Sequence, residues 1–239
     1  MEALSFRWHA KYGHFLRAEA NVNALSYPVP PRTSVLGLVA AILGLEKDAL
    51  ANELGDAQVA VAILGAVPQR FWHRIKLRKD PPVPLPWEVT KNQKGTDAPE
   101  KAALILQEWL LNPDFLVHIA LPEQSERFDE LVSRVWERRW HFSPCMGLSE
   151  FLCDVEFVSC QTVMPLPEGR YEIQGTCLES QARLLTGDKI GVHLLRMPHH
   201  VSADRVFTHA GYYLEHQGKP FPVQTGSAWR VGNQVVLFS

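Results

Sequence analysis

The strongest constraint on the fold comes from a proline-rich segment, residues 26–34, that runs directly into a stretch of small apolar residues, 35–44. Each proline fixes its own backbone and keeps the residue before it out of helical geometry. The apolar stretch then has the composition of a buried helix, with Thr33 or Ser34 as the predicted N-cap and Gly44 as the predicted stop. The sequence therefore predicts a stiff, extended lead-in that turns sharply into a short core helix.

Arg32 stands at the predicted start of this helix. The unpaired N–H groups and the dipole at a helix N-terminus already favour anions, and an arginine adds a full positive charge there. The pattern predicts a phosphate-binding corner in which Arg32 contacts a phosphate. Two alternatives stay open: a proline-rich loop that merely feeds a core helix, and a salt bridge from Arg32 to a nearby acid.

Length and composition describe a folded chain. The 239 residues suit one large domain or two small, closely packed ones, and 46% of them are hydrophobic. No apolar run approaches the ~20 residues of a membrane-spanning helix, and the N-terminus lacks a signal-peptide pattern, so we expect a cytoplasmic protein without membrane association. The cysteines and histidines lack metal-ligand spacing, so we expect reduced thiols, no metal and no cofactor.

Charge is unevenly distributed along the chain. Residues 68–94 hold seven Lys or Arg against two acids, a net charge of +5, which leaves −7 for the rest of a chain whose total is −2. Within 70–79, basic residues alternate with Phe71, His73, Ile75 and Leu77, a mostly apolar set. This alternation predicts a long hairpin arm with one basic face, and a local contact with a polyanion. A solvated charged loop is the alternative.

The remaining pattern predicts an α+β fold. Residues 80–99 are too rich in proline and polar residues for regular structure and suit a hairpin tip, whereas 103–110 is a returning strand or a short helix, with the strand favoured. The last third is predicted to be rich in β-strands. Four strands are expected at 3–9, 58–64, 115–121 and 153–163, with helices at 34–44, 47–54 and 125–139. This order resembles a split βαβ, ferredoxin-like unit.

Four features occur in order along the chain: Tyr12-Gly-His-Phe-Leu-Arg17 after the opening strand, Tyr27-Pro-Val-Pro-Pro-Arg-Thr-Ser34, the helix 36–44, and Met146-Gly-Leu-Ser-Glu-Phe151. Together they resemble the fifth family of CRISPR-associated proteins, a branch of the repeat-associated RAMP superfamily. The resemblance is specific over about the first 45 residues and again near 143–156. Elsewhere it rests on the order of elements.

The resemblance implies a ferredoxin-like or RRM-like domain over 1–160 with a protruding β-hairpin thumb at about 68–112, and a smaller β-rich part over 161–239. It also implies an RNA-binding subunit of a type I interference (Cascade) complex. Such a subunit grips the 5′ handle of the CRISPR RNA (crRNA), caps the repeated backbone subunit, and supports antiviral DNA targeting. The implied partners are crRNA, the backbone subunit, the large subunit and, through the complex, target DNA.

The predicted RNA contacts combine phosphate-binding cations with aromatic side chains on which bases stack. Tyr27 either stacks on a base or is a core aromatic, and the residues of the thumb tip contact RNA or a neighbouring backbone subunit. The glycine turn at Gly147 is read as structural. The full set of predicted contacts is Arg17, Tyr27, Arg32, Arg70, Arg74, Lys76, Arg78, Lys79, Trp87, Lys91 and Lys94.

One branch of the resembled family is a metal-independent endoribonuclease that cuts precursor RNA with a Tyr, a Lys and a His. Such chemistry needs a base for the ribose 2′-OH and a cation for the phosphate. The candidates here are His73 with Lys76, His141 beside Arg138 and Arg139, and Tyr12 or Tyr27. No Lys–His pair stands in the matching context, so no catalytic residue is assigned. Binding of the crRNA handle is the favoured interpretation, and cleavage of precursor RNA is the alternative. A small-molecule site in the last third of the chain is the least favoured of the three.

Overall fold

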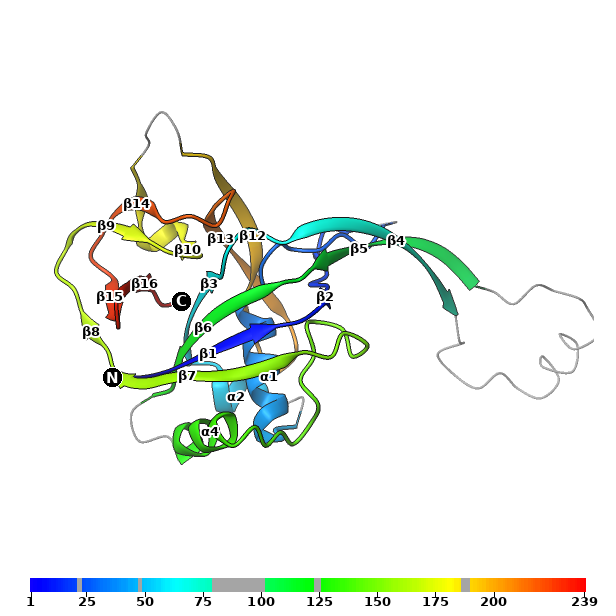
Figure 1. Cartoon of the computed structure of the whole chain (residues 1–239), viewed down its shortest axis with the longest axis horizontal. Helices are drawn as coiled ribbons and strands as arrows, with labels where there is room; N and C mark the ends of the chain where they lie inside the picture. The colour runs from blue at the N-terminus through cyan, green and yellow to red at the C-terminus, as the bar shows by residue number, and fades with distance from the viewer. Residues whose placement is uncertain (21–22, 47–48, 79–101, 123–125, 186–189) are drawn as a thin grey trace, which may run out of the picture.

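The computed structural model describes residues 1–20, 23–46, 49–78, 102–122, 126–185 and 190–239. A four-stranded antiparallel sheet forms the centre of the protein (Figure 1). Its strands are, in spatial order, β3 (Gln58–Ile63), β6 (Asp114–Ala120), β1 (Glu2–His9) and β7 (Asp154–Thr162). Each confirms a strand that the sequence predicts, to within one residue at either end.

Three helices lie on one side of this sheet, below it in Figure 1: α1 (Arg32–Leu43), α2 (Leu50–Leu54) and α4 (Glu126–Trp136). Gly44 ends α1 in the left-handed conformation, with φ of 79°, and its N–H donates to the Ala40 carbonyl 2.8 Å away, as predicted. The predicted cap by Thr33 or Ser34 is wrong. Pro31 is the N-cap and makes no side-chain hydrogen bond, because the proline-rich lead-in reaches helical geometry earlier than the small polar residues.

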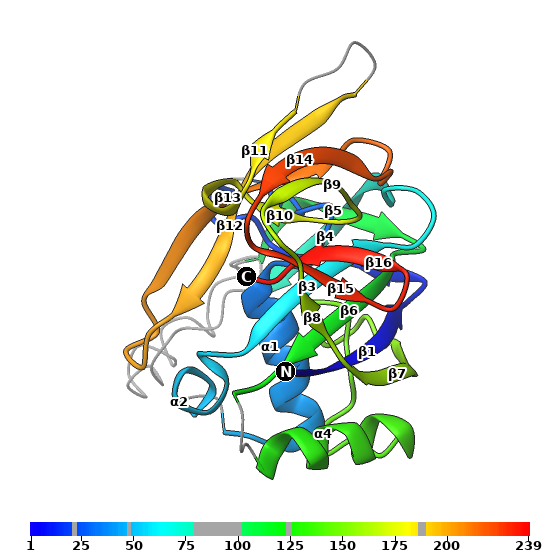
Figure 2. The ribbon, with the colours of Figure 1, turned by 90° about the vertical axis from the view of Figure 1, so that its left-hand side faces the viewer.

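Short antiparallel strands of the last third cover the opposite side of the sheet. Figure 2 shows β15 and β16 in front of β3 and β6, and Ala3, Ala60 and Ala120 pack there against Val231 and Val236. Residues on both faces of β1 are buried, because this C-terminal layer covers the second face. The strands are β8 (Met164–Pro165), β9 (Gly169–Ile173), β10 (Cys177–Leu178), β11 (Arg183–Leu184), β14 (Phe221–Thr225), β15 (Ala228–Val231) and β16 (Gln234–Leu237).

Two longer strands of the same region, β12 (Val192–Val201) and β13 (Phe207–Glu215), form a hairpin that lies beside α1 (Figure 2). Met197, Tyr212 and Leu214 of this hairpin belong to the same buried cluster as the residues of α1 and β1. The hairpin is therefore anchored to the central core and presents its tip beside the first turns of α1. A single 3₁₀ turn, Glu179–Gln181, precedes β11.

The predicted arm is a hairpin of β4 (Gln69–Arg78) and β5 (Ala102–Leu111) that projects from the body (Figure 1). The returning segment is a strand, as favoured from the sequence. On its other edge, β5 pairs with β2 (Tyr12–Gly13), which ties the base of the hairpin to the chain between β1 and α1. Among the helices of the described residues, none is long and apolar enough to cross a membrane.

His118 is a polar group in the middle of the central sheet. Its Nδ1 lies 2.8 Å from Ser5 Oγ and its Nε2 lies 3.1 Å from Gln234 Oε1, so it joins the central sheet to the C-terminal layer. Burial lowers the pKa of His118 from 6.5 to about 4. The folded protein therefore takes up this proton less readily than the unfolded chain does.

This shift predicts a loss of stability in mild acid. Between pH 6.5 and about 4 the unfolded state binds more protons, so the free energy of unfolding falls as the pH falls through that window. From about pH 7.5 to about pH 5 we expect His118 to contribute a loss of about 2 kcal/mol. Urea unfolding of the wild type and His118→Gln at the two pH values measures this. An equal pH dependence in both proteins would contradict the assignment.

Candidate nucleic-acid interface

One face of the β4–β5 hairpin combines positive charge with exposed apolar side chains. The register pairs Arg74 with Leu106, and paired residues of antiparallel strands share a face, on which Leu104 also lies, two residues before Leu106 on the same strand. Trp72 is on this face too. Trp72 is 48% exposed, Leu104 66% and Leu106 37%, and Arg74 is also exposed. The sequence predicts the basic character of this face but not its apolar residues, because residues 102–106 form a continuous apolar run that gives no sign of which side chains are exposed.

The opposite face of the hairpin base is an aromatic cluster. The Trp109 ring lies 4.4 Å from the His73 ring, 4.7 Å from Phe151 and 5.5 Å from Tyr12, measured between centroids. Phe71 packs into the same cluster, 5.8 Å from Trp109. These contacts fix the base of the hairpin on the body, because β5 is held through Trp109 by rings from three other segments.

A buried carboxylate organises the junction between hairpin and body. Glu108 of β5 accepts a 2.9 Å hydrogen bond from the Ser26 N–H and lies 3.5 Å from the Arg70 guanidinium. Arg70 keeps 47% of its side chain exposed. The His14 Nδ1 donates to the Glu108 carbonyl at 2.7 Å, and burial lowers the pKa of His14, which favours its neutral form. Arg70 is thus held at the hairpin base with part of its guanidinium open to a ligand.

Arg32 is placed differently from the prediction. It is 6% exposed, and its guanidinium donates to four backbone carbonyls: Gly55 at 2.7 Å, Ala57 at 2.6 Å, His199 at 3.0 Å and Ser239 at 2.9 Å. Three separate segments thereby join the first turn of α1. Neither the phosphate contact nor the predicted salt bridge describes this arrangement, since the guanidinium is enclosed by carbonyls. Arg32 is a structural clamp.

Tyr27 and Arg17 form a small unit beside this clamp. Tyr27 is fully buried, which agrees with the core alternative and leaves no face for a base. Its hydroxyl donates to Glu19 at 3.3 Å, and the Arg17 guanidinium lies 5.6 Å from its ring centroid. Arg17 also pairs with Glu19 at 2.9 Å, which lowers the pKa of that carboxyl. Arg17 keeps partial exposure, so it stays a prediction as an RNA contact.

The other predicted contacts lie on the hairpin or beyond it. Lys76 and Arg78 belong to β4, but their side chains are outside the described part of the chain. Four further residues, Lys79, Trp87, Lys91 and Lys94, lie outside the described residues altogether. The structure therefore brings Arg70 and Arg74 together on one strand and places Arg32 in a different, buried setting, and the contacts of the hairpin tip stay a prediction.

A cleft of about 440 Å³ lies at the start of α1. It is lined by the 14–18 segment, by Thr33 and Ser34 of α1, by Gly147 and its neighbour, and by Phe207 of β13. Gly147 has φ of 90°, and a Cβ built on it would lie 1.9 Å from the His14 carbonyl oxygen. Only glycine permits this approach, so the structural interpretation of the turn agrees with its geometry.

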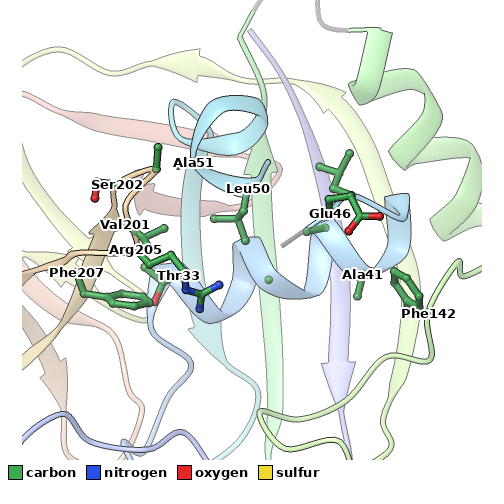
Figure 3. Close-up of a pocket in the computed structure, with 14 residues that line it drawn as sticks. Thr33, Ala41, Glu46, Leu50, Ala51, Phe142, Val201, Ser202, Arg205 and Phe207 are labelled. Atoms are coloured by element: carbon green, nitrogen blue, oxygen red, sulfur yellow. The ribbon is translucent and has the colours of Figure 1, made fainter. Parts of the chain in front are cut away.

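A second hollow of about 460 Å³ lies along the other side of Phe207 (Figure 3). It runs between α1, α2 and the tip of the β12–β13 hairpin, and its lining is mostly apolar. Figure 3 shows Phe207 beside Thr33 at one end and Phe142 at the other. Thr33 and Phe207 line both hollows, so they form the partition between them. Sequence reasoning missed Phe207, which has no motif around it.

The described residues contain no group of three or more His, Cys, Asp or Glu arranged to hold a metal ion. Of the candidate nuclease residues, His73 and Tyr12 lie in the aromatic cluster, on the face of the hairpin opposite Arg74. His141 lies against Gly44 at the end of α1, away from the hairpin. The structure does not bring these candidates together on the basic face.

Comparison with known proteins was made by sequence and by structure. A family model described as "CRISPR-associated protein (Cas_Cas5)" matches residues 3–180. No curated protein matches the chain in sequence. A chain of a solved structure described as "CRISPR RNA-guided surveillance complex" aligns with a TM-score of 0.54 at 17% identity, covering 91% of each chain. A CRISPR protein from Archaeoglobus fulgidus aligns with a TM-score of 0.53 at 16% identity, over 99% of this chain and 98% of that one.

These structural matches show the fold, and the family model covers well over half of the sequence. Its range begins in β1, contains the hairpin and Arg32, and reaches the first strands of the C-terminal layer. The chain belongs to the Cas5 family of CRISPR-associated proteins.

Proposed function

We propose that this protein is a non-catalytic, RNA-binding subunit of a type I CRISPR (Cascade) complex that grips the 5′ handle of the crRNA. The observation that carries the proposal is the mixed face of the β4–β5 hairpin. Arg74 and the partly open Arg70 lie there beside exposed Trp72, Leu104 and Leu106.

Single-stranded RNA offers two kinds of surface to such a face. Its phosphates attract Lys and Arg, and its unpaired bases stack on aromatic or apolar side chains. A duplex conceals its bases, so the exposed Trp72 and the two leucines favour a single strand over a duplex. The total charge of −2 also argues against general affinity for nucleic acid, because the positive charge is concentrated in residues 68–94.

We also propose that the first 160 residues form a ferredoxin-like or RRM-like domain, with the hairpin as its thumb and 161–239 as a smaller part packed on it. The spatial order β3-β6-β1-β7, with α1 between β1 and β3 and α4 between β6 and β7, supports this, because a split βαβ repeat connects its strands in that way. The protein is also proposed to contact the repeated backbone subunit and the large subunit, and through the complex, target DNA.

Charge reversal on the hairpin tests RNA binding. We expect Arg74→Glu to weaken binding of a single-stranded handle RNA about tenfold or more at moderate salt. It should also reduce the slope of log K against log salt by about 0.7, the value of one lost phosphate contact on a single strand. Fluorescence anisotropy over a range of salt concentrations measures both. Arg230→Glu is the matched control, because Arg230 is also exposed but lies on β15, far from the hairpin (Figure 1). Equal effects of the two variants would contradict the proposal.

The nuclease alternative is tested separately. The purified protein is incubated with a labelled repeat hairpin in EDTA and the RNA is run on a denaturing gel. We expect intact RNA that shifts on a native gel. A single cut in the RNA, at the base of its stem-loop, would instead establish that the protein is a metal-independent endoribonuclease.

A further inference from the structure

We propose that the cleft at the start of α1 holds one unpaired base of the bound RNA strand, stacked on Phe207. The inference rests on the proposed function and adds a second binding element to it. The hairpin face would hold the phosphates and stack on bases along its length, while the cleft would take a single base out of the strand.

The walls of the cleft suit a flat aromatic ligand. Phe207 is 45% exposed and Leu16 is 60% exposed, although both line a concave site. Leu148 and Pro198 complete the apolar lining. Large apolar side chains exposed in a concavity indicate a binding site more strongly than isolated apolar residues on a convex surface do. Every base has an apolar π-face that such walls can cover.

The polar groups of the cleft lie at one end. Thr33 and Ser34 are partly exposed in the first turn of α1 and line the cleft. Their hydroxyl groups can donate to acceptors on a base edge or its phosphate. His209 also lines the cleft, and its enclosed Nε2 has no hydrogen-bond partner among the described residues. A small rotation of that ring toward an occupant would complete its bonding.

The position of the cleft connects it to the hairpin. His14 lines the cleft and at the same time donates to the carbonyl of Glu108, the residue that holds Arg70 at the hairpin base. A strand that follows the hairpin face to its base therefore arrives at the cleft. The volume, about 440 Å³, lies in the range of small-ligand pockets and suits one nucleotide. The observations thus favour a base over a partner subunit.

A double-mutant cycle between protein and RNA tests this. An abasic site is placed at each position of the handle RNA in turn, and affinity is measured for the wild type and Phe207→Ala. At one position we expect the abasic site to weaken the wild type about tenfold and Phe207→Ala not at all, because the stacked pair is already lost. Phe207→Trp should restore the position dependence. Val206→Ala is the control, because Val206 is 62% exposed beside Phe207 but does not line the cleft.

The outcomes separate the two proposals. The base site is supported if the abasic substitution at a single RNA position weakens binding by the wild type but not by Phe207→Ala. If no position couples to Phe207 while Arg74→Glu still weakens binding, the base site is excluded and handle binding stands. If Phe207→Ala leaves RNA affinity intact but blocks assembly with other subunits, the cleft takes a protein and the proposal is also overturned. If the wild type binds no handle RNA, the proposed function itself fails. Circular dichroism checks that each variant remains folded.

Discussion

Arg32→Met is expected to lower the free energy of unfolding by roughly 3–5 kcal/mol. The substitution keeps much of the apolar volume but removes every donor that now serves the carbonyls of Gly55, Ala57, His199 and Ser239. These carbonyls converge on a guanidinium that is 6% exposed, so water cannot replace it without opening the junction. Buried acceptors left without donors cost more than the bonds themselves contribute. Urea denaturation followed by tryptophan fluorescence measures the change.

Two further variants identify the clamp as the cause. Arg32→Lys keeps the charge but replaces a planar fork by a single ammonium, so we expect it to recover only part of the loss. Arg74→Met, on the exposed hairpin face, should change the free energy of unfolding by no more than about 0.5 kcal/mol. The folded fraction of Arg32→Lys should bind handle RNA as the wild type does. A large loss of affinity with unchanged stability would instead favour the phosphate contact predicted from the sequence.

Arg32 illustrates what a single sequence can and cannot predict. An arginine that follows a proline-rich segment and begins a helix has the same local sequence pattern whether it binds a phosphate or backbone carbonyls. The partners that decide between these roles are remote in sequence: Ala57 lies just before β3, and His199 and Ser239 reach Arg32 only when the last third of the chain packs on the body. The sequence leaves the role of Tyr27 undecided for the same reason, since an aromatic residue before a core helix is equally suited to stacking on a base or to burial in the core.

Elements with a strong local period were predictable. The four central strands, the helix that ends at Gly44 and the hairpin that carries Arg74 all follow from alternation, helical spacing and turn residues. Burial of the second face of β1 was not predictable, because it depends on Val231 and Val236. These residues are remote from β1 in sequence and pack against it only in the folded protein. The exposed leucines of β5 and Phe207 were missed because an apolar residue in a strand is usually a core residue, and only the fold leaves these open.

Gly147→Ala is expected to destabilise the protein by roughly 2–4 kcal/mol, the second largest effect. Its φ of 90° disfavours any L side chain, and the added Cβ would lie 1.9 Å from the His14 carbonyl oxygen, a backbone atom that cannot rotate away. The turn must therefore move outward. The hydrogen bond from the His14 N–H to the Met146 carbonyl, now 3.0 Å long, is then strained or lost.

Gly37→Ala provides the matched control, because the same glycine-to-alanine change should there raise the free energy of unfolding instead of lowering it. Gly37 lies within α1, and nothing stands within 4 Å of a Cβ built on it, so alanine should stabilise the helix by up to about 1 kcal/mol. Thermal unfolding compares the two variants. Equal effects would show that the contact between the glycine turn and His14 is not made in solution. Because Gly147 also lines the cleft, its alanine variant should lose the position-specific part of RNA affinity even where it remains folded, whereas Gly37→Ala should keep it.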